Sequence, residues 1–171
     1  MELYKELNKN KEYIKNTLYG SDDIVFKEFE NNGTKCFLIY ADNIIRGTTI
    51  EEGILTNIMV RGEKNFDAFD MQNNLIAVGE TKLVQSFEEV FDAVLLGDTV
   101  LIVENDNRAI VISTKGWPSR GIPEAKTEVV VQGPKDAFTE LGSMNTVLIR
   151  RRIRDTALKV RRFKCGRRSK T

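Results

Sequence analysis

The side chains best suited to chemistry in this sequence are four arginines near its C-terminal end: Arg150, Arg151, Arg152 and Arg154. Arginine forms paired hydrogen bonds with carboxylates and phosphates, so the cluster predicts a binding surface. A structural alternative stays open, in which the arginines stabilise a helix C-terminus and pair with acids of the same domain. We expect no nucleic-acid partner, because Phe163 is the tail's only aromatic residue and the rest of the chain is acidic.

Residues for catalysis or metal binding are scarce in the sequence. It has no histidine and two cysteines, Cys36 and Cys165, which excludes histidine-based catalysis and a zinc cluster. Adjacent acids such as Glu88 and Glu89 lie at predicted helix starts, where a carboxylate interacts favourably with the positive end of the helix dipole. We therefore expect no enzymatic activity, no metal and no cofactor.

The loop at residues 116–121 has the glycine spacing of a phosphate-binding loop. Ile122 and Pro123 stand where such a loop requires a lysine and a serine or threonine. Nucleotide binding is not expected there, and an ordered loop held by Trp117 is the interpretation we prefer.

Charge is divided unevenly along the chain of 171 residues, although the formal net charge is only +1. From Ser143 to Thr171 there are 11 Lys and Arg and one acid, which leaves 15 basic and 24 acidic residues before Ser143. The body thus carries a net charge of −9 and the tail +10. This asymmetry indicates an electrostatic partner for the tail, or pairing between tail and body. No signal peptide or run of about 18 apolar residues is present, so we expect the chain itself to be soluble.

Helix-type and strand-type patterns alternate along the sequence. Helices are predicted over Glu2–Leu18, Thr48–Val60, about Phe66–Met71, a segment beginning after Ser86, and about Lys135–Arg154. Strands are predicted over Ile24–Phe29, Lys35–Ala41, Lys82–Gln85, Thr99–Val103, Ala109–Ser113 and Leu158–Cys165. The turn Asn31–Thr34 predicts a hairpin. The fold class is therefore α/β, a mixed β-sheet with hairpins flanked by helices and a long C-terminal helix followed by a strand.

The position of a side chain around the predicted C-terminal helix indicates whether it is buried or exposed. At helical spacing Asn145 falls on the apolar stripe, where a buried amide must hydrogen-bond, so we expect it to bind backbone at residues 132–136 or in a neighbouring strand. Arg152 lies nearest this stripe and is expected to anchor inside the domain. Arg150 and Arg151 are expected to be exposed and to serve a partner.

The two ends of the chain share a short similarity. Residues 24–36 read IVFKEFENNGTKC and residues 158–171 read LKVRRFKCGRRSKT. Each segment has an alternating strand, a phenylalanine, a turn with glycine, and a restart rich in Lys and Thr. We expect residues 1–156 to form a first α/β subdomain and residues 157–171 to lead into a second that repeats it.

The last third of the chain resembles the N-terminal soluble domain of GerA-type spore germinant receptor A subunits. The motifs that carry the resemblance are Ser119-Arg120, Glu128-Val129-Val130, Gly133-Pro134, Phe138-Thr139-Glu140 and Asn145 to Ile153. Gln132, Ala137 and Ala125 depart from the family pattern. The residues that the resemblance assigns to an interaction or structural motif are Arg120, Gly133, Pro134, Phe138, Glu140, Asn145, Arg150, Arg151 and Arg152.

The resemblance implies a part in nutrient-triggered spore germination. The parent protein would lie in the inner spore membrane, with this domain on the cytoplasmic side that faces the spore core. Other receptor subunits, the protein's own membrane region and further copies of the chain would be its partners, and the nutrient ligand stays open. The alternatives are a free-standing small-molecule binding domain and the related stage V sporulation protein AF.

Overall fold

The computed structural model describes residues 1–42, 44, 50–61, 66–76, 79–116 and 137–167. Its helices are α1 (Leu7–Thr17), the π-helical turn η1 (Glu51–Leu55), α3 (Thr56–Arg61), α4 (Ala68–Asn74), α5 (Phe87–Leu95) and α6 (Gly142–Arg152). Its strands are β1 (Ile24–Asn31), β2 (Thr34–Ala41), β3 (Thr81–Val84), β4 (Thr99–Val103) and β5 (Ala109–Ile112).

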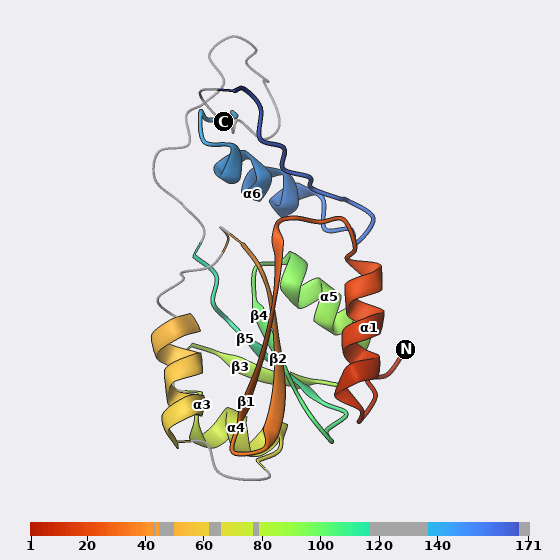
Figure 1. Cartoon of the computed structure of the whole chain (residues 1–171), viewed down its shortest axis with the longest axis vertical. Helices are drawn as coiled ribbons and strands as arrows, with labels where there is room; N and C mark the ends of the chain where they lie inside the picture. Colours follow the sequence, from red (N-terminus) through yellow and green to blue (C-terminus); the bar gives the residue numbers. More distant parts are fainter. Residues whose placement is uncertain (43, 45–49, 62–65, 77–78, 117–136, 168–171) are drawn as a thin grey trace.

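The strands form one five-stranded sheet in the order β1-β2-β4-β5-β3. Figure 1 shows helices on both sides of this sheet and α6 across one end of it. The predicted α/β fold, with hairpins in a sheet flanked by helices, is confirmed. In the described strands every pairing is antiparallel, so the parallel pairs expected of a mixed sheet are not found there.

The hairpin between β1 and β2 forms where the sequence predicts it. Asn32 and Gly33 both have positive φ, 50° and 83°. A two-residue hairpin turn of this kind needs such angles at both central positions, and asparagine and glycine adopt them most easily. The turn fixes the register, which pairs Asn31 with Thr34 and Ile24 with Ala41.

Both faces of the sheet are buried. Alternate residues of β2 show the arrangement: Phe37 and Ile39 belong to the core beneath α1 and α5. Cys36 and Leu38 belong to the core beneath α3 and α4. Because side chains alternate across a strand, a sheet covered on two faces gives a continuous apolar run, which residues 36–39 show.

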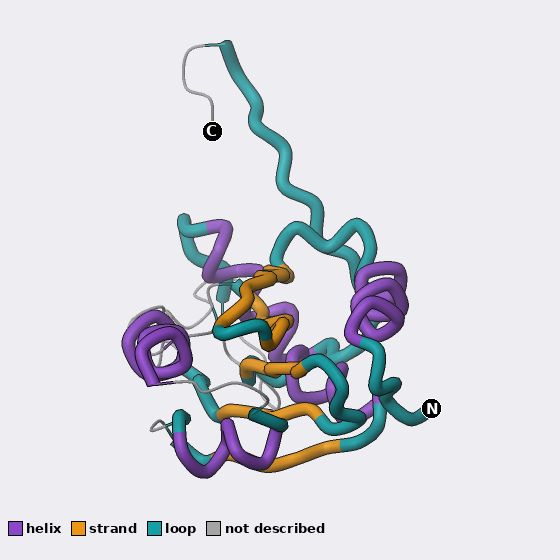
Figure 2. Tube along the Cα trace, turned by 60° about the horizontal axis from the view of Figure 1, so that its bottom comes forward, coloured by secondary structure: helices purple, strands orange, loops and turns teal. Residues whose placement is uncertain are grey.

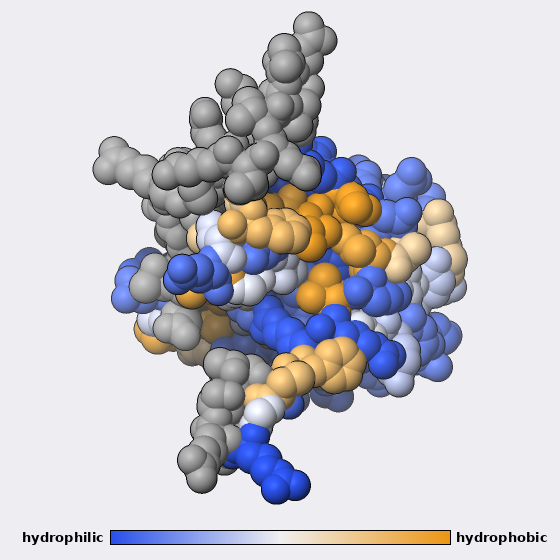
Figure 3. Space-filling model, turned by 90° about the horizontal axis from the view of Figure 1, so that it is seen from above, coloured by the Kyte–Doolittle hydropathy of each residue, from blue (hydrophilic) through white to orange (hydrophobic). Residues whose placement is uncertain are grey.

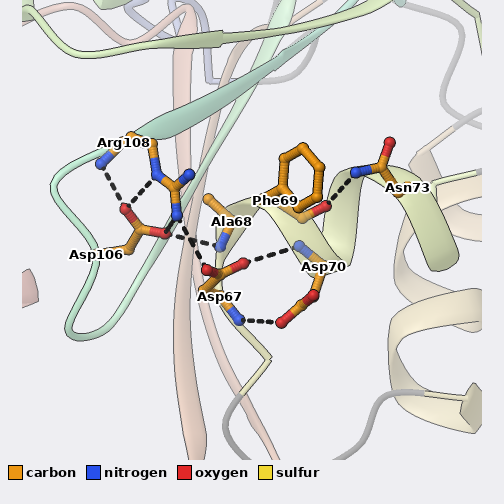
Figure 4. A network of polar contacts seen from close by, with 7 residues as sticks. All are labelled: Asp67, Ala68, Phe69, Asp70, Asn73, Asp106 and Arg108. Atoms are coloured by element: carbon orange, nitrogen blue, oxygen red, sulfur yellow. Dashed lines mark hydrogen bonds and ion pairs between the residues drawn. The ribbon is translucent and has the colours of Figure 1, made fainter.

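A polar network joins α4 to the turn between β4 and β5 (Figure 4). The Asp106 carboxylate accepts hydrogen bonds from the Ala68 backbone N–H and from the Arg108 guanidinium, each at 2.9 Å. Arg108 also contacts Asp67, the N-cap of α4, at 3.0 Å. Burial by itself would raise the pKa of Asp106, but the hydrogen bonds from Arg108 and Ala68 outweigh burial and hold that pKa below its ordinary value.

The first and last predicted helices are shorter than expected. Helix α1 begins at Leu7 instead of Glu2, since the Asn10 side chain binds both the N–H and the C=O of Tyr4 and keeps that residue out of the helix. Helix α6 begins at Gly142 instead of Lys135 within the described residues, for the same reason. There Asn145 binds the N–H and C=O of Thr139.

The strand predicted over Leu158–Cys165 is not found. These residues are extended, but their backbone makes a single described backbone–backbone hydrogen bond with the body, from the Asp22 N–H to the Val160 C=O at 2.7 Å. A strand requires a ladder of such bonds with a neighbour. Figure 2 shows this segment leaving the body toward the C-terminus.

Candidate interaction surface

Arg150 lies at the centre of the contact between α6 and the body. Its Nε donates to Asp23 Oδ2 at 2.7 Å and its Nη2 donates to Asp23 Oδ1 at 3.0 Å, which is the paired geometry of an arginine and a carboxylate. Nη2 also donates to Ser21 Oγ at 3.2 Å. Arg150 is 0% exposed and Asp23 is 1% exposed, so this ion pair is shielded from solvent.

The expected roles of the arginines are therefore wrong in one respect. Arg150, expected to be exposed, is buried, whereas Arg152, expected to anchor inside the domain, is exposed along with Arg151. The error follows from the stripe on which the prediction was based. Residues advance by about 100° around a helix, and the face that α6 buries holds Val147, Leu148 and Arg150.

Residues 20–23 also hold the chain that follows α6. The Asp22 carboxylate accepts a hydrogen bond from the Arg162 N–H at 2.8 Å, and Ser21 Oγ donates to the Leu158 C=O at 3.3 Å. Nearby, the Arg162 guanidinium contacts Asp42 at 3.2 Å. The acidic turn before β1 thus binds both α6 and the following segment, which confirms in part the pairing of tail with body that the charge distribution indicated.

Sequence reasoning did not identify Ser21 and Asp23 as members of this site. They follow Gly20, and the pattern there indicates only the end of a helix. Their partners are more than a hundred positions away along the chain, so no local spacing could have found them. The one available signal was the opposite charge of body and tail.

Large apolar side chains are exposed around α6. They are Phe138, Leu141, Ile153 and Phe163. Figure 3 views the molecule from the α6 end and shows apolar surface gathered beside hydrophilic surface. Exposed apolar side chains that gather on one face mark interaction sites. Here Ile153 and Phe163 lie within the basic segment from Ser143 to Thr171, and Phe138 and Leu141 come just before it.

Of the remaining predicted site residues, Asn145 and Glu140 lie within the described residues and three others do not. Asn145 is half-buried and binds the backbone of Thr139, which corrects the expectation of a buried amide bound near residues 132–136. Glu140 is exposed in a bend before α6. Arg120, Gly133 and Pro134 lie outside the described residues.

A shallow cleft opens between α1, α5 and the residues just after α6. Its volume is about 390 Å³. Aromatic and charged side chains share its walls, among them Tyr13, Phe91, Asp92 and Arg154. Within the described ranges no three His, Cys, Asp or Glu side chains lie close enough together to hold a metal ion. Those ranges also contain no helix long and apolar enough to cross a membrane.

Comparison with known proteins decides the family. Residues 12–171 match the family model described as "Bacillus/Clostridium GerA spore germination protein". The chain belongs to the GerA family. The resemblance seen in the last third of the sequence is thereby confirmed over most of its length.

Individual relatives support the assignment of the chain to the GerA family. The chain is 33% identical over 173 residues to stage V sporulation protein AF of Bacillus subtilis, covering 99% of this chain and 35% of the relative. It is 28% identical over 166 residues to spore germination protein KA of B. subtilis, covering 94% of this chain and 30% of the relative. The chain thus spans about a third of the length of these relatives.

A solved GerA-family structure shares the fold. It is the N-terminal domain of the A subunit of the Bacillus megaterium spore germinant receptor GerK3, with a TM-score of 0.75 and 23% identity. The match covers 98% of this chain and 62% of that one. The chain therefore has the fold of the N-terminal domain of a germinant receptor A subunit. The two relatives above are a sporulation protein and a germination protein by name, and neither name describes an enzyme.

Proposed function

We propose that this chain is part of the N-terminal region of a spore germinant receptor A subunit and takes part in nutrient-triggered germination signalling and in receptor assembly. The observation that carries the proposal is the family match over residues 12–171, joined to the fold match over 98% of the chain. The parent protein would lie in the inner spore membrane, with this domain on the cytoplasmic side. Its partners would be the other receptor subunits and its own membrane region.

The surface around α6 is the part of the domain best suited to those contacts. Arg150 is committed to Asp23 inside the domain, so it positions the helix and is not part of the contact surface. Arg151 and Arg152 at the end of α6, and Arg154 just after it, are exposed. Basic side chains beside exposed apolar ones fit a protein partner that offers carboxylates and an apolar patch.

The test is a charge reversal in spores. Arg151→Glu combined with Arg152→Glu should slow nutrient-triggered germination and lower the amount of assembled receptor in the spore membrane fraction. A matched control is Lys27→Glu with Arg61→Glu, two exposed basic residues on β1 and α3. This control should germinate normally.

Thermal unfolding of the purified chain separates function from folding. Both double variants should melt close to the wild type, because all four side chains are exposed. Normal germination and normal receptor levels in the Arg151/Arg152 variant would contradict the proposed role of this surface. Normal germination in spores lacking the whole gene product would contradict the receptor assignment itself.

A further inference from the structure

The cleft between α1, α5 and the residues just after α6 has an aromatic wall. The Tyr13 ring of α1 packs against the Phe87 ring of α5, with centroids 4.4 Å apart, and the Phe91 ring lies 6.2 Å and 6.4 Å from these two centroids. Tyr13 is 38% exposed and Phe91 is half-buried, so part of this aromatic surface meets solvent. Figure 1 shows α1 and α5 next to each other on one side of the sheet. The wall is thus built by the two helices that cover this face of the sheet.

Carboxylates line the same cleft. Glu88 and Asp92 of α5 and Asp155 after α6 contribute to its lining, and Arg154 is the one basic side chain among the described residues there. Glu88 and Asp92 are four positions apart on one helix, so their side chains are neighbours on its surface. Aromatic rings and carboxylates therefore share one opening of about 390 Å³.

The two acids of α5 are placed unfavourably for the stability of the helix. Like charges four positions apart repel each other. Asp92 also lies in the last turn of a helix that ends at Leu95, where the helix dipole disfavours a negative charge. Both acids are exposed, and among the residues that the structure describes neither one takes part in an ion pair. A positive group in the cleft would offset both unfavourable interactions.

Another part of this domain shows how a ring and a carboxylate together hold a cation. The Lys15 Nζ lies 5.6 Å from the centroid of the Phe37 ring and 2.7 Å from Glu28 Oε1. The ring offers the negative face of its quadrupole and the carboxylate offers a full charge. The cleft has both kinds of group on its walls, and the two acids of α5 have no cation paired with them in the described part of the chain.

From these observations we propose that the cleft binds an arginine side chain of a partner protein. A guanidinium is planar, stacks on aromatic rings and forms paired hydrogen bonds with carboxylates, which suits this set of groups better than a lysine ammonium does. The apolar stem of the arginine packs against the rings and Leu95. This preference is opposite to that of the surface around α6, whose exposed arginines fit carboxylates of a partner. The inference does not rest on a role in germination, so it can fail or succeed separately from the proposed function.

The test is an NMR titration of the isotope-labelled 171-residue chain with two tripeptides. One is acetyl-Gly-Arg-Gly-amide, and the other carries citrulline, which has the shape of arginine but an uncharged urea in place of the guanidinium. The arginine peptide should shift the ring signals of Tyr13 and Phe91 with a Kd on the order of 1 mM, and the citrulline peptide should bind about tenfold more weakly. Methylguanidinium has the same charged group without the stem, so it should bind several-fold more weakly than the arginine peptide.

Variants locate the binding site. Asp92→Asn removes a charge and Tyr13→Leu removes an aromatic face, so each should weaken binding of the arginine peptide by about threefold to tenfold. Glu52→Gln is the matched control, at an exposed acid of η1 outside the cleft, and should bind like the wild type. Asp92→Asn should also melt at or above the wild-type temperature, because it removes the repulsion from Glu88 and from the helix dipole.

Three results would overturn the inference. If the arginine peptide leaves the Tyr13 and Phe91 signals unchanged, or binds no better than the citrulline peptide, the cleft does not recognise a guanidinium. Equal binding of the arginine peptide and methylguanidinium would make a free small cation the occupant. A melting temperature of Asp92→Asn below that of the wild type would show that Asp92 already serves a structural contact.

Discussion

At the scale of single residues, neighbours in one basic run have opposite roles. Arg150 is buried and paired with Asp23, whereas Arg151 and Arg152, the next two residues, are exposed. The geometry of the helix produces this difference, since each step of one residue turns the side chain by about 100°. A run of like charges on a helix therefore cannot be assigned one function as a whole.

The buried ion pair makes a first prediction. Arg150→Ala or Asp23→Ala should each lower the free energy of unfolding by about 3–5 kcal/mol, because each leaves a buried charge without its partner. Urea unfolding followed by circular dichroism measures this. Arg151→Ala is the control and should cost less than about 1 kcal/mol. An Arg150→Ala variant as stable as the Arg151→Ala variant would contradict the assignment of Arg150 to the interior.

The Asp106–Arg108 contact makes a second prediction, on pH. Because the folded state lowers the pKa of Asp106 from its ordinary value of 3.8, the contact stabilises the fold above pH 3.8 and loses its effect as the pH falls further. Arg108→Ala should cost about 1–3 kcal/mol near pH 7. The difference in unfolding free energy between the variant and the wild type should shrink below pH 3.8. A difference that stays constant down to pH 2 would contradict the role of the charged pair.

At the scale of elements, side chains decide where the helices begin. The apolar spacing of residues 2–18 predicts one continuous helix. The Asn10 side chain instead binds the N–H and C=O of Tyr4, which lies outside the helix, and the Leu3 N–H donates to the Gln85 C=O at 2.8 Å. Leu3 consequently packs in the core beside α5 without belonging to a helix. Leu3, Leu7, Ile14 and Leu18 of this pattern are all buried, although Leu3 lies outside the helix.

The Asn10 and Asn145 side chains make a third prediction. Asn10→Ala should lower the free energy of unfolding by about 1–3 kcal/mol, because Asn10 is fully buried and its loss leaves both backbone groups of Tyr4 unpaired. Asn145→Ala should cost less, since Asn145 is half-buried whereas Asn10 is 0% exposed. Thermal melts of the two variants test the order. A larger effect at Asn145 would contradict the solvent argument.

At the scale of the whole molecule, the sheet is an interior layer between two helical layers. Cys36 lies on β2 in this layer, and burial raises the pKa of its thiol to about 12. Cys165 lies in the exposed segment after α6. Both are free thiols in the structure.

This layering makes a fourth prediction. Iodoacetamide at pH 8 should modify Cys165 within minutes, whereas Cys36 should react only after the sheet opens, because the thiolate is the reacting species and Cys36 is neither ionised nor accessible. Mass spectrometry of the native protein should therefore show a single adduct, and of the protein in urea two. Rapid double modification without denaturant would contradict a sheet covered on both faces.

The sequence by itself determined the features that depend on short spacings. Asn32-Gly33 predicted the first hairpin, and Ser86 with Glu89 predicted the start of α5, where a capping box forms. The strand predicted over Lys35–Ala41 is found as β2. Such features need only a few neighbouring residues, so their physical cause is contained in a short window. The motifs of the last third also sufficed to recognise the GerA family, which the match over residues 12–171 confirmed.

The tertiary structure alone decided the pairings over long distances. Asp23 and Arg150 are 127 positions apart, and no local pattern selects one partner among 25 acids and 26 bases. The extended segment after α6 was predicted as a strand from alternation, but a strand also needs a neighbouring strand to bond with. The described residues provide a single backbone–backbone hydrogen bond between this segment and the body. Propensity is a property of the segment, whereas burial and pairing are properties of what the fold places beside it.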